Sequence, residues 1–317
     1  DDGYRVYVNG EKVIDYWGEH ASAKRDYTLK ATAGTDYKIR IEYMQAGAEA
    51  LLRFDLGIYR HISPEMVVDR VKEADIVIFA GGISPSLEGE EMYSVNSPGF
   101  AGGDRTSIEL PQVQRDILKA LKKAGKKVVF VNCSGSAVAL VPEIESCDAI
   151  LQAWYPGQAG GLAVADVLFG DFNPSGKLPV TFYKNTDQLP DFEDYSMKNR
   201  TYRYMTEAPL FPFGYGLSYT TFDISKGRLN KKTISAGQDL NFKVNVKNTG
   251  KYDGEEVSQL YMRDEYASVV QPMKQLKHFE RFHLKKGEEK KVTFVLTEED
   301  FFLVNYTLKK VVESGNC

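Results

Sequence analysis

Two changes of hydrophobic period along the chain constrain its fold more than any other feature. Between residues 62 and 222, short apolar runs alternate with amphipathic segments, and the run over residues 76–80 is apolar at every position. Such a run predicts a strand covered on both faces, as in a parallel sheet. The alternation therefore predicts an α/β domain over residues 62–222 with a mostly parallel, doubly wound sheet.

The expected helices and strands of this domain have clear boundaries. Pro111 and Gly125 mark the start and the stop of an amphipathic helix, with Ile117, Leu118 and Leu121 facing inward. The full set comprises helices over residues 66–74, 111–124 and 157–170 and strands over residues 76–80, 127–132 and 149–155.

Both flanking regions show the period of two that is typical of strands. The expected strands lie at residues 4–8, 12–17, 37–43 and 51–56 in the first region and at 240–246, 257–262 and 291–296 in the second. Asn9-Gly10 predicts a hairpin turn after the first strand. Residues 1–61 are thus predicted to form a partial β segment, and residues 223–317 a small β-sandwich. The predicted fold class is multidomain.

The composition excludes several kinds of partner. The 317 residues carry a formal net charge of −4, which favours neither nucleic acid nor an anionic membrane surface. No apolar run is long enough to cross a bilayer. Three cysteines supply neither a disulfide framework nor a CxxC metal spacing, and no metal or cofactor is expected. The chain begins at Asp1 without a signal peptide, and we expect both ends to be cut from a longer protein.

The connection after the apolar strand is the candidate chemical site. It runs about thirty residues, from Gly82 to Pro111, although strand-to-helix loops usually hold only a few. Glu88, Glu90 and Glu91 place three carboxylates within four residues, and partial burial of any one would raise its pKa. A Glu that stays protonated near neutral pH can protonate the oxygen of a departing sugar.

This loop is either a catalytic acid loop or a solvated acidic loop tip. In the first interpretation, Arg105, later in the same connection, could pair with one carboxylate and lower its pKa, so that the paired and unpaired carboxylates would have different roles. From the spacing alone, however, a solvated acidic loop tip is the commoner interpretation.

Other polar motifs are weaker candidates. Gly157, Gly160 and Gly161 open a helix after a strand without the GxGxxG spacing, so close helix–sheet packing is the better interpretation. Ser134 lacks a GxSxG elbow and is interpreted as a polar strand cap. The four histidines are scattered, at His20, His61, His278 and His283. None of these motifs predicts a nucleotide or metal site.

Several motifs resemble glycoside hydrolase family 3 and cover nearly the whole chain. Those of its α/β domain are ADIVIFAGG at 74–82, GDR at 103–105, LPxxQ at 110–114, VNxSG at 131–135, AWYPGQ at 153–158, ADVLFGD at 165–171 and PSGKLP at 174–179. The most specific is YRY at 202–204 followed by PLFPFGYGLSYT at 209–220. Residues 223–317 resemble the family's fibronectin-III-like domain, and residues 1–61 resemble the latter part of a PA14 domain.

The resemblance implies a retaining exo-β-glycosidase, a β-xylosidase or β-glucosidase acting on terminal sugars of plant-type oligosaccharides. The Leu-Glu-Gly-Glu loop with Gly-Gly-Asp-Arg-Thr favours the xylosidase. In the family, an Asp on an N-terminal barrel attacks the sugar and a Glu from the second domain protonates the leaving group. This maps the general acid/base to Glu90, with Glu91 and Glu88 as rivals. Glu88, Asp104 and Arg105 are expected to bind substrate or to shape the loop.

The resemblance also implies partners and a location. The barrel with the nucleophile is not in this chain, so we expect the fragment alone to be inactive. The expected partners are this barrel and an oligosaccharide, with homodimer formation left open, and the expected location is periplasmic or secreted. The alternative is a non-catalytic glycan-binding module that uses the PA14-like part as its contact surface.

Overall fold

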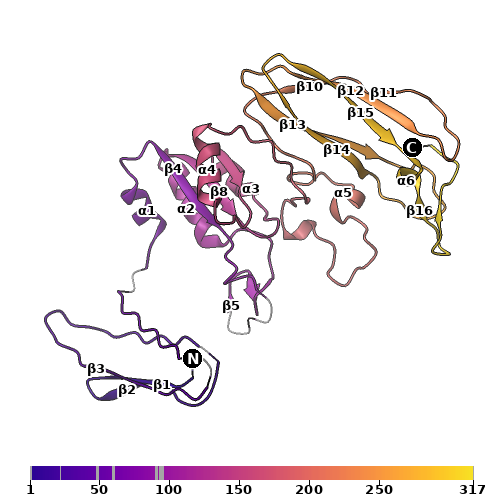
Figure 1. The fold of residues 1–317 in the computed structure, drawn as a ribbon. Coiled ribbons are helices and arrows are strands. Elements are labelled where there is room, and N and C mark those ends of the chain that lie inside the picture. The colour runs from indigo at the N-terminus through magenta and orange to yellow at the C-terminus, as the bar shows by residue number, and fades with distance from the viewer. Residues whose placement is uncertain are drawn as a thin grey trace. The chain divides into compact units, whose positions relative to one another are not determined.

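The computed structural model describes residues 2–21, 23–47, 50–58, 61–89, 92 and 96–316. The chain divides into two compact units, residues 1–61 and residues 62–317, and each is described by itself. In Figure 1 the first unit is indigo, and the second runs from violet through magenta and orange to yellow.

The first unit is an antiparallel sheet of three strands in the order β2–β1–β3. β1 (Tyr4–Val8) pairs with β2 (Glu11–Tyr16) along one edge and with β3 (Ile39–Tyr43) along the other. Asn9 and Gly10 have φ angles of 51° and 89°, which a tight hairpin turn of this kind requires. These strands and the turn confirm the sequence prediction.

The strand predicted over residues 51–56 is wrong. The described residues 50–58 contain no strand, and Leu56 is 77% exposed. A strand needs a neighbour that pairs with its backbone groups, and none of the described strands pairs with this segment. The assignment of residues 1–61 to a PA14 domain stays a prediction.

The second unit begins with a parallel sheet of three strands in the order β4–β8–β9. β4 (Ile76–Gly82) and β9 (Ala149–Gln152) flank β8 (Lys127–Cys133), and all three predicted strands are confirmed. The helices of this domain are α1 (Pro64–Arg70), α2 (Gln112–Lys123), α3 (Val141–Ser146) and α4 (Gly160–Phe169). α2 packs on β8 and contacts both α1 and α3.

The central helix forms as the sequence predicts. Leu118 and Leu121 of α2 are buried and Ile117 is partly buried in the same core. Gly125, just past the helix, has a φ of 75°, the left-handed conformation that commonly ends helices. The amphipathic pattern of α2 therefore places its apolar face on the sheet.

One prediction about the sheet is wrong, because β4 is not covered on both faces. Successive side chains of a strand point to opposite faces. Val77 and Phe79 pack into the core with α1 and α2, whereas Ile76 and Ile78 are 55% and 52% exposed. Among the described residues, two-sided burial is found in the middle strand, where Phe130 is fully buried, and not at the β4 edge.

The last part of the second unit is a small β-sandwich. In one sheet β12 (Leu240–Asn248) pairs with β10 (Phe222–Ile224), β11 (Arg228–Leu229) and β15 (Glu289–Leu296). In the other, β13 (Gly254–Met262) pairs with β14 (Gln275–Leu284). Side chains from both sheets form one core, with Val244, Val246, Phe282, Leu284, Val292 and Phe294 buried. The strands predicted in this region are confirmed.

Short elements complete the second unit. They are β5 (Asn96–Ser97), β6 (Phe100–Ala101), β7 (Asp104–Arg105), η1 (Thr186–Gln188), α5 (Thr201–Tyr204), α6 (Glu298–Phe301), β16 (Leu303–Val304) and β17 (Lys310–Val311). Within the described parts of the chain, no helix is long and apolar enough to cross a membrane.

The aromatic motif over residues 202–220 joins the α/β domain to the sandwich. The ring of Tyr202 stacks on Phe213 at 4.2 Å and meets Tyr261 of β13 edge to face at 6.0 Å. The Tyr202 hydroxyl accepts a hydrogen bond from the Leu276 backbone amide of β14 at 3.3 Å. The motif most specific to the family therefore forms part of the interface between these two domains.

Candidate active site

Three loops meet at the carboxyl-terminal edge of the parallel sheet, where open α/β sheets bind their ligands. The loop after β4 carries Glu88, the loop after β8 carries Ser136, and Tyr155 follows β9. Arg105 reaches the same place from β7. These four residues are called the Glu88 cluster below.

The Glu88 carboxylate is held from three sides. Ser136 donates its hydroxyl hydrogen to Oε1 at 3.0 Å, and the Tyr155 hydroxyl donates to Oε2 at 3.5 Å. Nη1 of Arg105 lies 3.7 Å from Oε1. The Glu88 side chain is 24% exposed, so the carboxylate has limited room to move. The charge of Glu88 is thus matched by a cation and two hydroxyl donors.

Arg105 connects this carboxylate to the loop after β8. Its Nη1 donates to the Ser136 hydroxyl at 2.8 Å and to the Ala137 carbonyl at 3.0 Å, and its Nε donates to the Ser107 carbonyl at 3.3 Å. The side chain is 10% exposed. Burial lowers the pKa of Arg105, and the nearby Glu88 carboxylate opposes that shift. Among the described residues, the buried Nη2 has no hydrogen-bond partner.

The start of the Glu88 loop is anchored by α2. Gln114 accepts a hydrogen bond from the Gly82 amide at 2.8 Å and donates one to the Gly82 carbonyl at 2.7 Å. The next amide, of Ile83, donates to the Cys133 carbonyl at 2.9 Å. These bonds keep the chain beside β8 for one residue beyond the end of β4.

The far end of the loop packs against the turn before β7. The Met92 amide donates to the Gly102 carbonyl at 2.9 Å. Gly103 has a φ of 91°, and a Cβ atom there would lie 2.0 Å from the Gly89 carbonyl oxygen. The backbone can approach this closely only because residue 103 has no side chain. The loop is therefore attached at Gly89 and at Met92.

The position of the Tyr155 ring requires a residue without a side chain opposite it. A Cβ atom on Gly135 would lie 2.4 Å from Cε2 of Tyr155. Trp154, just before it, has a φ of 59° and packs edge to face on Phe182 at 6.0 Å. Partial burial and the nearby Glu88 carboxylate raise the pKa of Tyr155. A strained backbone at residue 154 thus places the Tyr155 hydroxyl beside Glu88.

Ser134 is fully buried in a polar network at the same edge. Its hydroxyl donates to the Ser136 carbonyl at 2.9 Å and accepts from the Gln152 amide group at 3.2 Å. The Asn132 amide group donates to Gln152 at 2.6 Å. These contacts fit the interpretation of Ser134 as a strand cap, because they link the ends of β8 and β9.

The other predicted site residues are distributed differently. Glu90 and Glu91 lie outside the described residues. Asp104 is exposed, and within the described part of the chain no hydrogen bond or ion pair joins its carboxylate to Glu88 or Arg105. The same part contains no group of three or more His, Cys, Asp and Glu side chains that could hold a metal ion.

Two members of the Glu88 cluster were not proposed as site residues from the sequence. Ser136 and Tyr155 each follow a predicted strand of the parallel sheet by a few residues. The rule that ligands bind beyond the carboxyl ends of parallel strands could have selected both loops. It could not have selected these residues within them, because the contact to Glu88 joins positions 48 and 67 residues apart.

Comparison with known protein families decides the identity of the fold. The sequence model of the glycosyl hydrolase family 3 C-terminal domain matches residues 8–219, and that of the fibronectin type III-like domain matches residues 256–317. The chain belongs to glycosyl hydrolase family 3. The whole Glu88 cluster lies inside the first match.

Individual relatives agree with this family 3 assignment. A xylan 1,4-beta-xylosidase of Xylanibacter ruminicola is 52% identical over 93% of this chain and 34% of its own length. A periplasmic beta-glucosidase of Salmonella typhimurium is 41% identical over 80% of this chain and 34% of its length. The solved beta-glucosidase of Kluyveromyces marxianus is 29% identical, with a TM-score of 0.76, over 99% of this chain and 40% of that one. The family 3 chain thus spans about a third of the curated relatives it matches.

Glu109 attaches a distant segment of the family 3 domain to the edge of the sheet. Its carboxylate accepts hydrogen bonds from the Thr186 amide at 2.9 Å, from the Thr186 hydroxyl at 2.5 Å and from the Ser107 hydroxyl. Burial by itself would raise the pKa of Glu109, but these hydrogen bonds outweigh it and lower the pKa to about 2. Glu109 therefore has a structural role beside the loop of Arg105.

Proposed function

We propose that this chain supplies the general acid/base of a retaining exo-β-glycosidase of family 3. The observation that carries the proposal is the Glu88 cluster, which braces an acidic loop at the ligand-binding edge of the α/β domain. The proposed reaction is hydrolysis of the terminal, non-reducing sugar of plant-type oligosaccharides. The names of the relatives, xylosidases and glucosidases, support this substrate class.

Glu90 is the proposed proton donor, and Glu91 is its rival. Glu88 already receives a hydroxyl hydrogen bond from Ser136 and lies 3.7 Å from the Arg105 guanidinium. A carboxylate held in this way is better suited to orienting the loop than to moving a proton. The attachment points at Gly89 and Met92 bracket residues 90 and 91. Both attachment points are thus next to the proposed donors in the sequence.

Arg105 is proposed as a further contributor to this site. Its buried Nη2 has no partner among the described residues, and a buried unpaired donor costs about 1–3 kcal/mol. A substrate hydroxyl or the carboxylate of residue 90 or 91 would satisfy it. Asp104 has no comparable contact with any residue that the structure describes, and its proposed role is limited to the shape of the turn.

The second carboxylate of the reaction is proposed to lie on a barrel domain outside this chain. A retaining site needs a nucleophile and an acid/base about 5–5.5 Å apart. The chain spans about a third of its curated relatives, which leaves room for that domain in the whole protein. We therefore expect purified chain alone to release no product from an aryl β-xyloside or β-glucoside.

Xylose is the sugar we favour over glucose, because the relative at 52% identity is a xylosidase and that at 41% is a glucosidase. A periplasmic or secreted location is proposed on the same grounds, since the second relative is named periplasmic.

The proposal is tested in an enzyme restored by joining this chain to the part of the Xylanibacter ruminicola relative that it does not cover. Replacing the general acid slows substrates with poor leaving groups far more than activated aryl glycosides, because activated leaving groups need no proton. Glu90→Ala should show this split, and Glu91→Ala should not. The reverse result assigns the proton to Glu91, whereas equal losses on both substrates from both variants contradict an acid/base role for the loop.

A further inference from the structure

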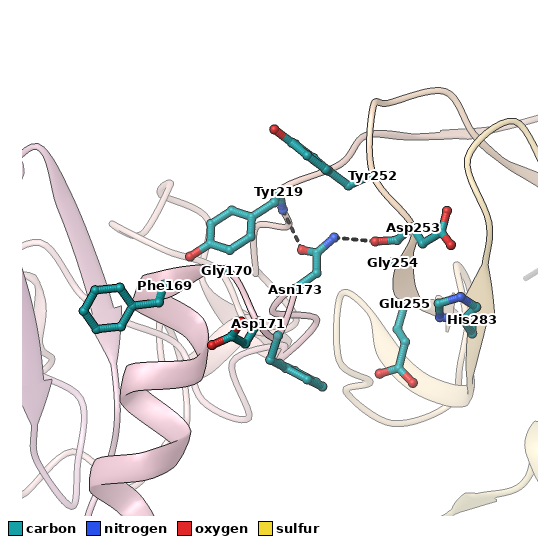
Figure 2. Close-up of a pocket in the computed structure, with 11 residues that line it drawn as sticks. Phe169, Gly170, Asp171, Asn173, Tyr219, Tyr252, Asp253, Gly254, Glu255 and His283 are labelled. Atoms are coloured by element: carbon teal, nitrogen blue, oxygen red, sulfur yellow. Dashed lines mark hydrogen bonds between the residues drawn. The ribbon is translucent and has the colours of Figure 1, made fainter.

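A second groove lies between the end of α4 and the start of β13, away from the Glu88 cluster. Its volume is about 790 Å³, within the range of about 300–1,000 Å³ that is usual for small-molecule sites. It lies where the α/β domain meets the sandwich, and it contains no residue of the Glu88 cluster. Figure 2 shows its lining side chains around Asn173.

Exposed aromatic rings are the main feature of this groove. Phe169 is 80% exposed, Tyr252 is 60% exposed, and Tyr219 and Phe172 are each nearly half exposed. Four such rings around one hollow are unusual, because large aromatic side chains normally bury most of their surface. Flat rings with one open face match the flat, C–H-bearing face of a pyranose sugar.

One of these rings is held rigidly in place. The Tyr219 hydroxyl donates to the Val167 carbonyl at 2.7 Å, and the Tyr219 amide donates to Oδ1 of Asn173 at 2.8 Å. Asn173 in turn donates to the Asp253 carbonyl at 3.0 Å, and Figure 2 shows its bonds with Tyr219 and Asp253 as dashed lines. A ring fixed before binding loses little conformational entropy when a ligand arrives.

The two sides of the groove are also packed against each other. A Cβ atom on Gly254 would lie 2.7 Å from Nδ2 of Asn173. Ser175 donates to the Glu255 carboxylate at 3.3 Å, and Lys177 pairs with Glu256 at 2.9 Å. These contacts join the α/β domain to β13. The groove is therefore formed by the fold itself.

The polar groups of the groove select the kind of sugar. The groove is also lined by three carboxylates and one imidazole, those of Asp171, Asp253, Glu255 and His283. Figure 2 shows the carboxylates pointing in different directions, and that of Glu255 is paired with Arg281. Carboxylates accept hydrogen bonds from sugar hydroxyls and repel anionic groups. The groove thus favours neutral sugars over uronic acids, sulfated glycans or phosphates.

We propose that this groove is a second, non-catalytic glycan site that binds a neutral β-linked oligosaccharide. The inference rests on the proposed function, because it takes the substrate class of the enzyme as its ligand. It would hold such an oligosaccharide at the junction of the two domains, apart from the site of cleavage.

The test measures binding of xylotetraose and cellotetraose to the complete 317-residue chain by NMR titration, without any need for activity. At least one of the two should bind, while tetragalacturonate should not. Tyr252→Ala and Phe169→Ala should each weaken binding by about fivefold, a typical effect of losing one stacked ring. Both side chains are exposed, so the thermal unfolding midpoint should change little.

The matched control is Tyr306→Ala, which removes an 82% exposed ring between β16 and β17. It should leave the affinity unchanged. Absence of binding, or equal weakening by Tyr306→Ala, overturns the glycan site while leaving the proposed hydrolysis intact. Conversely, binding that depends on Tyr252 together with an inactive restored enzyme would refute the proposed function and keep the groove.

Discussion

Gln114 and Gly82 are joined by two hydrogen bonds, one in each direction, between a helix side chain and the backbone at the end of a strand. The donor–acceptor distances are 2.8 Å and 2.7 Å. Because Gly82 is the last residue of β4, this pair sets the point at which the acidic loop leaves the sheet. The position of Glu88 therefore depends on a residue in α2.

Removing this pair should destabilise the protein measurably. Gln114→Leu leaves the Gly82 amide and carbonyl without partners, and we expect a loss of about 1–3 kcal/mol in the free energy of unfolding. Urea denaturation provides the measurement. Gln112→Ala, at an exposed position of the same helix, should change it by less than about 0.5 kcal/mol. Equal losses from the two variants would contradict the role given to Gln114.

The two neighbouring glycines before β7, Gly102 and Gly103, provide a test of whether the acidic loop packs against this turn. Gly103→Ala would place a Cβ atom 2.0 Å from the Gly89 carbonyl oxygen, whereas a Cβ atom on Gly102 meets nothing within 4 Å. Both residues have positive φ angles, of 91° and 62°, so both variants bear a backbone cost of about 1–2 kcal/mol.

Only Gly103→Ala should add a steric penalty and displace the acidic loop. We expect it to be clearly less stable than Gly102→Ala in thermal unfolding. In the restored enzyme it should also lower kcat more than Gly102→Ala does. Variants of identical stability would show that the loop does not pack on Gly103 in solution.

Glu109 predicts a specific dependence of stability on pH. Its pKa in the folded state is about 2, below the ordinary value of 4.5. The carboxylate therefore stabilises the fold fully above the ordinary value, and this contribution is lost as the pH falls from about 4.5 to about 2. Glu109→Gln removes the contribution, so its unfolding free energy should fall less steeply than that of the unaltered protein across this window.

The control for this comparison is Glu145→Gln, an exposed position on α3. Its pH profile should run parallel to that of the unaltered protein. A Glu109→Gln profile that also runs parallel would mean that the hydrogen bonds from Thr186 and Ser107 do not lower the pKa of Glu109.

The interface between the α/β domain and the sandwich yields a fourth prediction. Tyr202→Ala removes the ring that stacks on Phe213 and meets Tyr261. We expect a loss of about 2–4 kcal/mol in the free energy of unfolding. We also expect two separate thermal transitions in the variant and a single one for the second unit of the unaltered protein. Calorimetry provides the measurement. Tyr195→Ala, which removes an 86% exposed ring, should leave the transition unchanged.

Sequence patterns succeeded where one physical signal dominates. Apart from residues 51–56, the period-two strands are confirmed, as are the stop at Gly125 and the turn at Asn9-Gly10, and all of these depend on residues that are close in the chain. The pattern failed at residues 51–56 and at the outer face of β4. In both places, strand formation or burial depends on which other segments of the chain pack alongside, and the local hydrophobic pattern does not identify those segments.

The candidate site divides in the same way. The sequence by itself determined the family, the alternation of strands and helices that forms a parallel sheet, and the acidic loop at Glu88. These follow from motifs and from the local hydrophobic period. Only the tertiary structure decided that Ser136 and Tyr155 contact Glu88 and that Arg105 is buried behind it. Such contacts arise when parallel strands bring their carboxyl ends to one edge, so residues distant in the chain become neighbours.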